Sequence, residues 1–163
     1  MKTTNRKHRQ NKSKAILVGM LLGVMSLVAC NNNVIYHEEL DMPYEKWAME
    51  DVYRYAFDIN DSSQICDMYI NIRNTIDYPY ENAYFFFTTT FPDGNKANDT
   101  LECILADKYG QWTGEGHGHY RHNRLLFKRH CYFPQVGTYR IEVRQAMREE
   151  IEGIASFGIE LIK

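Results

Sequence analysis

Apolar and polar residues alternate with a period of two along much of the chain after residue 50. In the stretch VYRYAFDI, Tyr53, Tyr55, Phe57 and Ile59 alternate with Arg54, Ala56 and Asp58. Successive side chains of a β-strand point to opposite faces, so this pattern predicts a strand with one buried face. Aromatic and β-branched residues, which suit a pleated sheet, dominate AYFFFTTTF at 83–91.

Seven segments of this kind are separated by turn residues such as the Pro-Asp-Gly of 92–94. The predicted strands are residues 52–59, 68–74, 83–91, 100–105, 124–133, 138–145 and 154–162. Short strands at these intervals predict an all-β fold, an antiparallel β-sandwich of about seven to eight strands. The segment WAMED at 47–51 is interpreted as a brief helical turn.

The N-terminus has the pattern of a secretory signal peptide. Its first fourteen residues contain six basic and no acidic side chains, and residues 15–29 are apolar, AILVGMLLGVMSLVA. As a helix this run would span roughly 22 Å, which is short of a bilayer core of about 30 Å. A signal peptide is therefore favoured over a permanent transmembrane helix.

The apolar run ends in Leu27-Val28-Ala29-Cys30, which matches a bacterial lipobox. The match predicts cleavage after Ala29 and a diacylglyceryl and N-acyl lipid on Cys30, whereas an ordinary cleaved signal followed by a chance cysteine is the alternative. Multiple acyl chains anchor a protein stably. The predicted organisation is a signal peptide at 1–29, the lipidated cysteine and tether at 30–35, and a sandwich domain at 36–163.

Asn31 stands where inner-membrane lipoproteins of well-studied bacteria have aspartate, so we expect the periplasmic face of the outer membrane. Residues 30–163 carry 13 basic and 21 acidic side chains, a net charge of −8. This charge argues against nucleic acid as a partner. Three cysteines remain after the lipobox, and the favoured disulfide joins Cys103 to Cys131, with buried free thiols as the alternative.

The segment ADKYGQWTGEGHGHYRHN at 106–123 places His117, His119 and His122 close to Glu115. Histidines at this spacing are weak candidates for a zinc or copper site, and a flexible loop without metal is the favoured interpretation. We expect no cofactor beyond the lipid on Cys30. The chain has no GxSxG, HExxH, P-loop or GxGxxG motif, which argues against an enzyme with a small-molecule substrate.

Aromatic residues are abundant, with twelve tyrosines, two tryptophans and eight phenylalanines. Exposed rings on a sandwich can stack on sugars, and Trp112 with Tyr109 is the candidate platform. Aromatic residues on strands more often form the core and cross-strand pairs. An exposed Trp112 beside other rings would favour glycan binding, and a Trp112 folded onto the core would favour a role in protein assembly.

Several blocks in the same order resemble the gliding-motility lipoprotein GldH family. They are IRNTIDYPY at 72–80, TFPDG at 90–94, DTLEC at 99–103, FPQVGTY at 133–139 and IEVRQAMRE at 141–149. The resemblance extends from about residue 36 to 162. It implies a non-enzymatic envelope lipoprotein associated with the machinery for gliding and type IX secretion. The favoured interpretation of IRNTIDYPY is a turn that positions two strands. The alternative is that Tyr78 and Tyr80, which flank Pro79, contact a partner protein, with Trp112 as a further candidate contact.

Overall fold

The computed structural model describes residues 33–163, so the predicted signal peptide, the cleavage site at Ala29 and the lipidation site at Cys30 lie outside the described residues. The described part contains ten β-strands and one 3-10 turn, Pro43–Glu45. The strands are β1 (Val34–Asp41), β2 (Lys46–Ala48), β3 (Tyr53–Ile59), β4 (Ile65–Thr75), β5 (Asn82–Thr90), β6 (Lys96–Ile104), β7 (Tyr120–Tyr132), β8 (Gly137–Gln145), β9 (Glu150–Glu152) and β10 (Ile154–Ile162). Among these residues no helix is long and apolar enough to cross a membrane.

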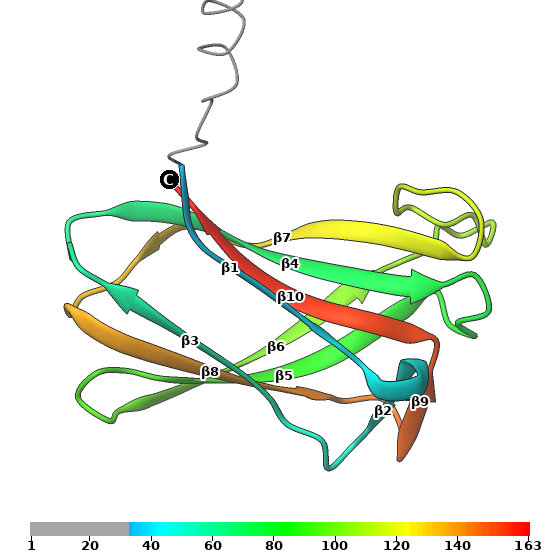
Figure 1. Ribbon diagram of the computed structural model, residues 1–163, viewed down its shortest axis with the longest axis horizontal. Coiled ribbons are helices and arrows are strands. Elements are labelled where there is room, and N and C mark those ends of the chain that lie inside the picture. The colour runs from blue at the N-terminus through cyan, green and yellow to red at the C-terminus, as the bar shows by residue number, and fades with distance from the viewer. Residues whose placement is uncertain (1–32) are drawn as a thin grey trace, which may run out of the picture. The chain divides into compact units, whose positions relative to one another are not determined.

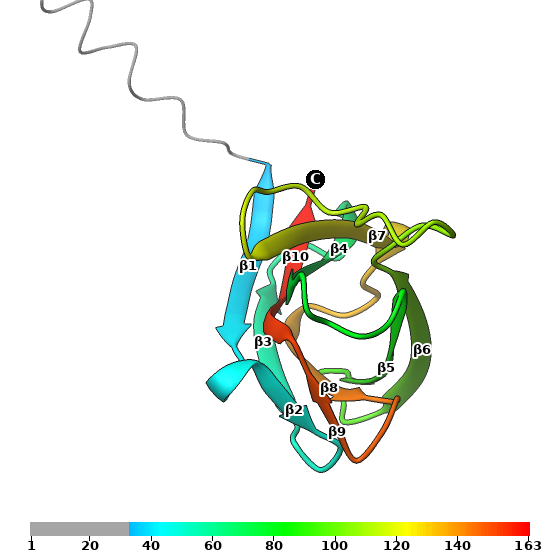
Figure 2. The same cartoon turned by 90° about the vertical axis from the view of Figure 1, so that its right-hand side faces the viewer.

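Two four-stranded antiparallel sheets face each other (Figure 1). One has the strand order β1-β10-β4-β7 and the other has the order β3-β8-β5-β6. The short strands β2 and β9 pair with each other at one end, beside the corner that follows β1 (Figure 2). The sequence-based prediction of an all-β antiparallel sandwich is confirmed.

Aromatic side chains fill the space between the sheets. Trp47 is fully buried, and its ring centroid lies 5.3 Å from that of Phe85 and 5.4 Å from that of Phe157. The buried hydroxyl of Tyr55 donates a hydrogen bond of 2.8 Å to the Phe157 carbonyl oxygen, which ties the two sheets together. The aromatic abundance seen in the sequence therefore serves the core to a large extent.

All seven predicted strands are present, and the sequence analysis missed β1, β2 and β9. The helical turn predicted at 47–51 is wrong, because Trp47 lies in β2 opposite Ile151 of β9. In β1 the inward-facing series includes Glu38, which interrupts the apolar alternation and hides the strand. The Tyr36 hydroxyl donates a hydrogen bond to this carboxylate at its partly buried position.

Candidate docking groove

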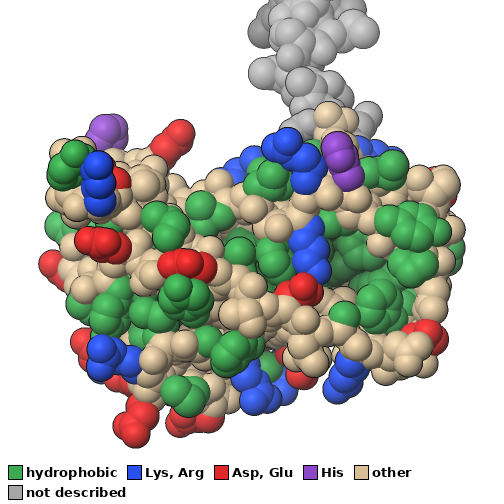
Figure 3. All heavy atoms as spheres, turned by 180° about the vertical axis from the view of Figure 1, so that it is seen from behind, with side chains coloured by type: hydrophobic (Ala, Val, Ile, Leu, Met, Phe, Trp, Pro, Cys, Tyr) green, Lys and Arg blue, Asp and Glu red, His purple; other side chains and the backbone are tan. Residues whose placement is uncertain are grey.

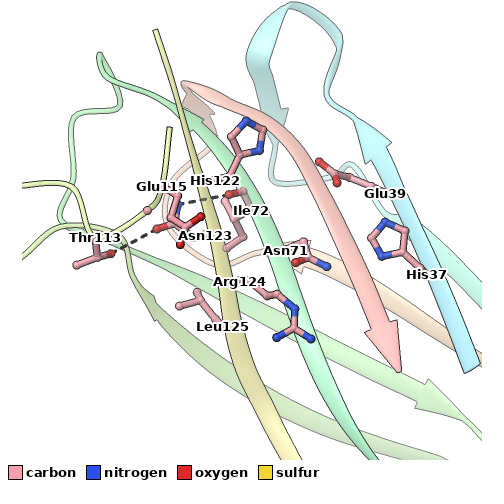
Figure 4. A pocket seen from close by; sticks show the side chains of 11 residues that line it. His37, Glu39, Asn71, Ile72, Thr113, Glu115, His122, Asn123, Arg124 and Leu125 are labelled. Atoms are coloured by element: carbon pink, nitrogen blue, oxygen red, sulfur yellow. Dashed lines mark hydrogen bonds between the residues drawn. The ribbon is translucent and has the colours of Figure 1, made fainter. Parts of the chain in front are cut away.

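The outer face of the β1-β10-β4-β7 sheet carries a polar groove of about 480 Å³ (Figure 4). Side chains from β1, β4 and β7 line it, together with the loop that precedes β7. The lining residues are His37, Glu39, Asn71, Ile72, Thr113, Gly114, Glu115, His122, Asn123, Arg124 and Leu125.

The strand register explains why the sheet is hollowed here. Glu39 of β1 pairs with Gly158 of β10, Gly158 pairs with Asn71 of β4, and Asn71 pairs with Arg124 of β7. This row therefore has a glycine at its second position, where no side chain rises from the sheet. A Cβ atom at Gly158 would lie 3.0 Å from the Glu38 carbonyl oxygen, so the close approach of β1 also favours glycine.

The loop before β7 forms one wall of the groove. Glu115 and His122 form a β-bridge in which the Glu115 N–H donates to the His122 oxygen at 2.9 Å and the His122 N–H donates back at 2.7 Å. Farther along, a Cβ atom at Gly114 would lie 2.7 Å from the Asn123 side-chain oxygen. The loop thus lies tightly against β7 and holds Thr113 and Glu115 at the groove.

Two charged side chains of the groove are already engaged. The Arg124 guanidinium lies 3.5 Å from the centre of the Tyr69 ring, and its Nε donates to Glu160 at 2.7 Å. On the opposite side, Glu39 accepts a hydrogen bond from the Ser156 hydroxyl. These contacts orient both side chains, and preorganised polar groups favour specific binding.

Asn71 differs from its neighbours because its Nδ2 atom is buried and has no hydrogen-bond partner among the described residues. A buried donor without an acceptor costs about 1–3 kcal/mol. The atom has almost no exposed surface, so a ligand oxygen in the groove can supply the acceptor only after the Asn71 amide rotates toward it. With carboxylates at Glu39 and Glu115 and donors at Asn71 and Arg124, the groove can bind a ligand that has both carbonyl oxygens and N–H or O–H groups.

The structure separates the two tyrosines that were predicted to contact a partner. Tyr78 is only 3% exposed, and its hydroxyl donates to the Asn82 carbonyl oxygen at 3.0 Å. Burial raises the pKa of Tyr78. Tyr78 is therefore a core residue and does not lie on the exposed surface. Tyr80 packs edge-on against it at 5.5 Å between ring centres, is half-buried, and lies beneath the Arg148 guanidinium.

Trp112 is half-buried and packs against the hydrophobic core. Its backbone forms an isolated β-bridge with Ala106, which closes the base of the loop. Tyr109, the other member of the candidate sugar platform, is 75% exposed. The ring of Trp112 packs on the core and does not stand free beside Tyr109. A Trp112 folded onto the core was expected for a role in protein assembly, so its position favours that role over glycan binding.

The three loop histidines have different surroundings. His122 lines the groove, His117 is exposed, and the His119 ring lies 3.8 Å from an Asp77 carboxylate oxygen and 4.0 Å from one of Glu45. No group of three or more metal-ligating side chains comes together within residues 33–163. Of the three histidines, His122 is therefore the one that the structure brings into the groove.

The favoured disulfide between Cys103 and Cys131 is wrong, because the two cysteines lie in different sheets. Cys103 is buried on β6 opposite Ala83 of β5, whereas Cys131 of β7 lies in the other sheet, directly opposite Cys66 of β4. All three thiols are free in the structure. Burial raises the pKa of Cys103 to about 12. Both cysteines do lie in strands, as predicted, but the sequence does not tell which strands share a sheet.

The sequence analysis missed His37, Glu39, Asn71 and Arg124. Only the alternation of polar residues on one face of β1 and of β7 hinted at an outer polar surface. Nothing in the sequence indicated that Gly158 would lie between Glu39 and Asn71.

Comparison with known proteins agrees with the resemblance stated for the sequence. The family model described as GldH lipoprotein matches residues 34–161, nearly the whole described part of the chain. The chain belongs to the GldH lipoprotein family. A relative named gliding motility lipoprotein GldH homolog, from Christiangramia forsetii, is 31% identical over 143 residues and covers 83% of this chain and 87% of its own length.

A second GldH relative, the gliding motility lipoprotein GldH of Flavobacterium johnsoniae, is 25% identical over 150 residues, which cover 87% of this chain and 92% of that protein. Among solved structures, dimeric latent PorU from Porphyromonas gingivalis matches with a TM-score of 0.35 and 9% identity. That match covers 79% of this chain and only 13% of the PorU chain.

Proposed function

We propose that this GldH family member is a non-catalytic lipoprotein of the gliding machinery, anchored in the outer membrane through Cys30, and that it binds a partner protein of that machinery in the polar groove. The relatives named as gliding motility lipoproteins support the assignment to gliding. The lipobox at Leu27 to Cys30 supports the anchor. The buried, unpartnered Nδ2 of Asn71 supports binding at the groove.

The anchor restricts how the domain sits on the membrane. Two residues lie between Cys30 and Asn33, and an extended chain advances at most about 3.6 Å for each of the three steps, so the tether can reach at most roughly 10 Å. The Asn33 carbonyl oxygen accepts a hydrogen bond of 2.8 Å from the Lys163 N–H. With such an anchor, the end of the domain that contains Asn33 and Lys163 would lie within reach of the lipid, whereas the loop that precedes β7 belongs to the opposite end of the domain (Figure 1).

An extended segment of a partner protein fits the chemistry of the groove. Its carbonyl oxygens would accept from Asn71, and its N–H groups would donate to Glu39 or Glu115. Glycan binding, the alternative considered for the sequence, is less well supported, because no Phe, Tyr or Trp side chain is among the residues that line the groove. Stacking on aromatic rings is what a sugar platform would require.

The groove is tested by replacing Asn71 with leucine, which keeps a similar size and removes the donor. A strain of Flavobacterium johnsoniae that lacks its own GldH is complemented with this chain or its variants, and spreading on agar is measured. We expect Asn71→Leu to reduce spreading relative to the unaltered chain. Asn98→Leu, on the outer face of β6 in the other sheet, serves as the matched control.

A photo-reactive residue at Glu115 gives a direct readout in the source bacterium. We expect a crosslink to one envelope protein from position 115 and none from Glu102, which lies on the other sheet. Equal crosslinking from both positions, or a crosslink at 115 that persists in Asn71→Leu, would contradict binding in the groove. Loss of membrane fractionation in Cys30→Ala tests the anchor separately.

A further inference from the structure

Two cysteines that the proposed docking role does not use lie directly opposite each other. Cys66, near the start of β4, is the register partner of Cys131, near the end of β7. The side chain of Cys66 is 2% exposed, whereas Cys131 is half-buried. The Cys131 thiol donates a hydrogen bond of 3.5 Å to the Lys128 carbonyl oxygen and is not bonded to Cys66. Opposite positions on antiparallel strands place the two Cβ atoms about 4.5–5.5 Å apart. A disulfide needs about 3.5–4.5 Å, so the two strands must approach slightly for the bond to form.

We propose that Cys66 and Cys131 form a cross-strand disulfide once the chain reaches the oxidising envelope. This inference rests on the export assumed in the proposed function. Disulfides form and persist in such compartments. Cys103 stays a free thiol because it is buried in the other sheet.

The surroundings of Cys131 make it the thiol that reacts first. It lines a hollow of about 410 Å³ whose other walls include Met68, Phe133 and Tyr139. Figure 3 shows the molecule from behind Figure 1, with exposed hydrophobic side chains around a hollow beside basic and acidic groups. The neighbouring Cys66 thiol lowers the pKa of Cys131, and the charge of Lys128 acts in the same direction. A thiolate is the attacking species in thiol exchange.

The oxidation balances by thiol–disulfide exchange with an envelope dithiol oxidase. The Cys131 thiolate attacks one sulfur of the donor's disulfide, forms a mixed disulfide and releases the donor's other sulfur as a thiolate. Cys66 then loses its proton, attacks the Cys131 sulfur and displaces the donor. Two electrons and two protons pass to the donor, which leaves as a dithiol.

The strand pairing around Cys66 and Cys131 indicates which part of the fold a disulfide would stabilise. The β4-β7 ladder shifts its register on both sides of Met68, and His130 of β7 has a positive φ of 52°. β7 is also an edge strand of its sheet. A covalent link between Cys66 and Cys131 would hold this irregular end of the ladder together and close a long loop, which restricts the unfolded chain.

The test counts free thiols in the mature lipoprotein, in which the lipid blocks Cys30. Envelopes are lysed in an alkylating agent, and the denatured protein is digested and analysed by mass spectrometry. We expect one alkylated thiol, at Cys103, and a linked pair of peptides containing Cys66 and Cys131. After reduction all three should react. In Cys66→Ala, Cys131 should become alkylated, whereas Cys103→Ala should leave the linked pair unchanged.

Three alkylated thiols in protein that carries its lipid would overturn the disulfide while leaving the anchor intact, as would a peptide that links Cys103 to Cys131. Protein without lipid on Cys30 would contradict the proposed anchoring. In that case the purified, folded chain is oxidised with oxidised glutathione, and failure to link Cys66 to Cys131 overturns the inference. The oxidised protein should melt on the order of 10 °C above the reduced protein, and Cys66→Ala should abolish this difference.

Discussion

The two four-stranded sheets differ in how regularly their strands pair. In the β3-β8-β5-β6 sheet every ladder runs without a register shift, including nine consecutive pairs from Asn82↔Ile104 to Thr90↔Lys96. In the β1-β10-β4-β7 sheet all three ladders contain a shift. Bulges of this kind re-aim side chains and are frequent beside functional sites. The irregular sheet carries the groove and the opposed thiols, and the regular sheet serves mainly as its support.

The largest expected effect concerns the core that both sheets share. Phe85 and Phe86 are neighbours on β5, one fully buried and the other 53% exposed. Phe85→Ala should lower the free energy of unfolding by about 3–5 kcal/mol, because it removes a ring packed against Trp47 and Phe157. Phe86→Ala should cost less than about 0.5 kcal/mol. Urea unfolding measures both, and similar losses would contradict the assignment of the two faces.

Two glycines with positive φ, one beside each sheet, should differ in how much stability is lost when they are replaced by alanine. Gly153 (φ +92°) precedes β10, and its added Cβ atom would lie 2.8 Å from Thr75 Oγ1, whereas Gly94 (φ +88°) lies in the open β5-β6 turn. Gly94→Ala should lower the free energy of unfolding by about 1–2 kcal/mol, which is the cost of a left-handed backbone conformation for alanine. At Gly153 it must also displace its neighbours, so we expect a loss of about 2–4 kcal/mol. Equal thermal shifts in the two variants would show that the space around Gly153 can relax.

A smaller loss of stability is expected from a buried pair of amide side chains beside the groove. Asn123 Nδ2 donates to Asn74 Oδ1 at 2.8 Å, and both side chains are buried. Asn123→Ala leaves the Asn74 oxygen without this donor and should cost about 1–3 kcal/mol. Asn98 bonds to Thr88 on the exposed face of the regular sheet, so Asn98→Ala should change stability by less than about 0.5 kcal/mol. Both values come from urea unfolding, and a stability of Asn123→Ala close to that of Asn98→Ala would rule out a structural role for the pair.

The strands of the regular sheet were the easier ones to predict. Along β3 and β8, buried side chains alternate with exposed ones, as the sequence pattern requires, and no bulge interrupts the series. β1 was missed because Glu38 faces inward, and β2 and β9 are only three residues long. Short range patterns therefore identified strands wherever one face was uniformly apolar.

The groove and the thiol pair could not be read from local patterns. The row from Glu39 through Gly158 and Asn71 to Arg124 depends on the register of three ladders, each of which contains a shift. The opposition of Cys66 and Cys131 depends on the same shifts. A change of register by one residue moves every side chain of a strand to the other face. Both sites form only when strands that are distant in the sequence pair in the correct register, so no short sequence motif encodes them.

The smallest expected effect is a pH dependence at the turn of the regular sheet. A hydrogen bond from Gln135 and others from Asn95 lower the pKa of Asp93, which lies in the turn between β5 and β6. Because the folded pKa lies below the unfolded one, about 3.9 for aspartate, this contribution is present above pH 4 and is lost as the pH falls through the folded pKa. Asp93 is fully exposed, so solvent screens the interaction.

Asp93→Asn should reduce the change in Tm between pH 6 and pH 3 by at most about 2 °C. An unchanged or steeper acid dependence would show that the acid-sensitive contribution does not come from Asp93.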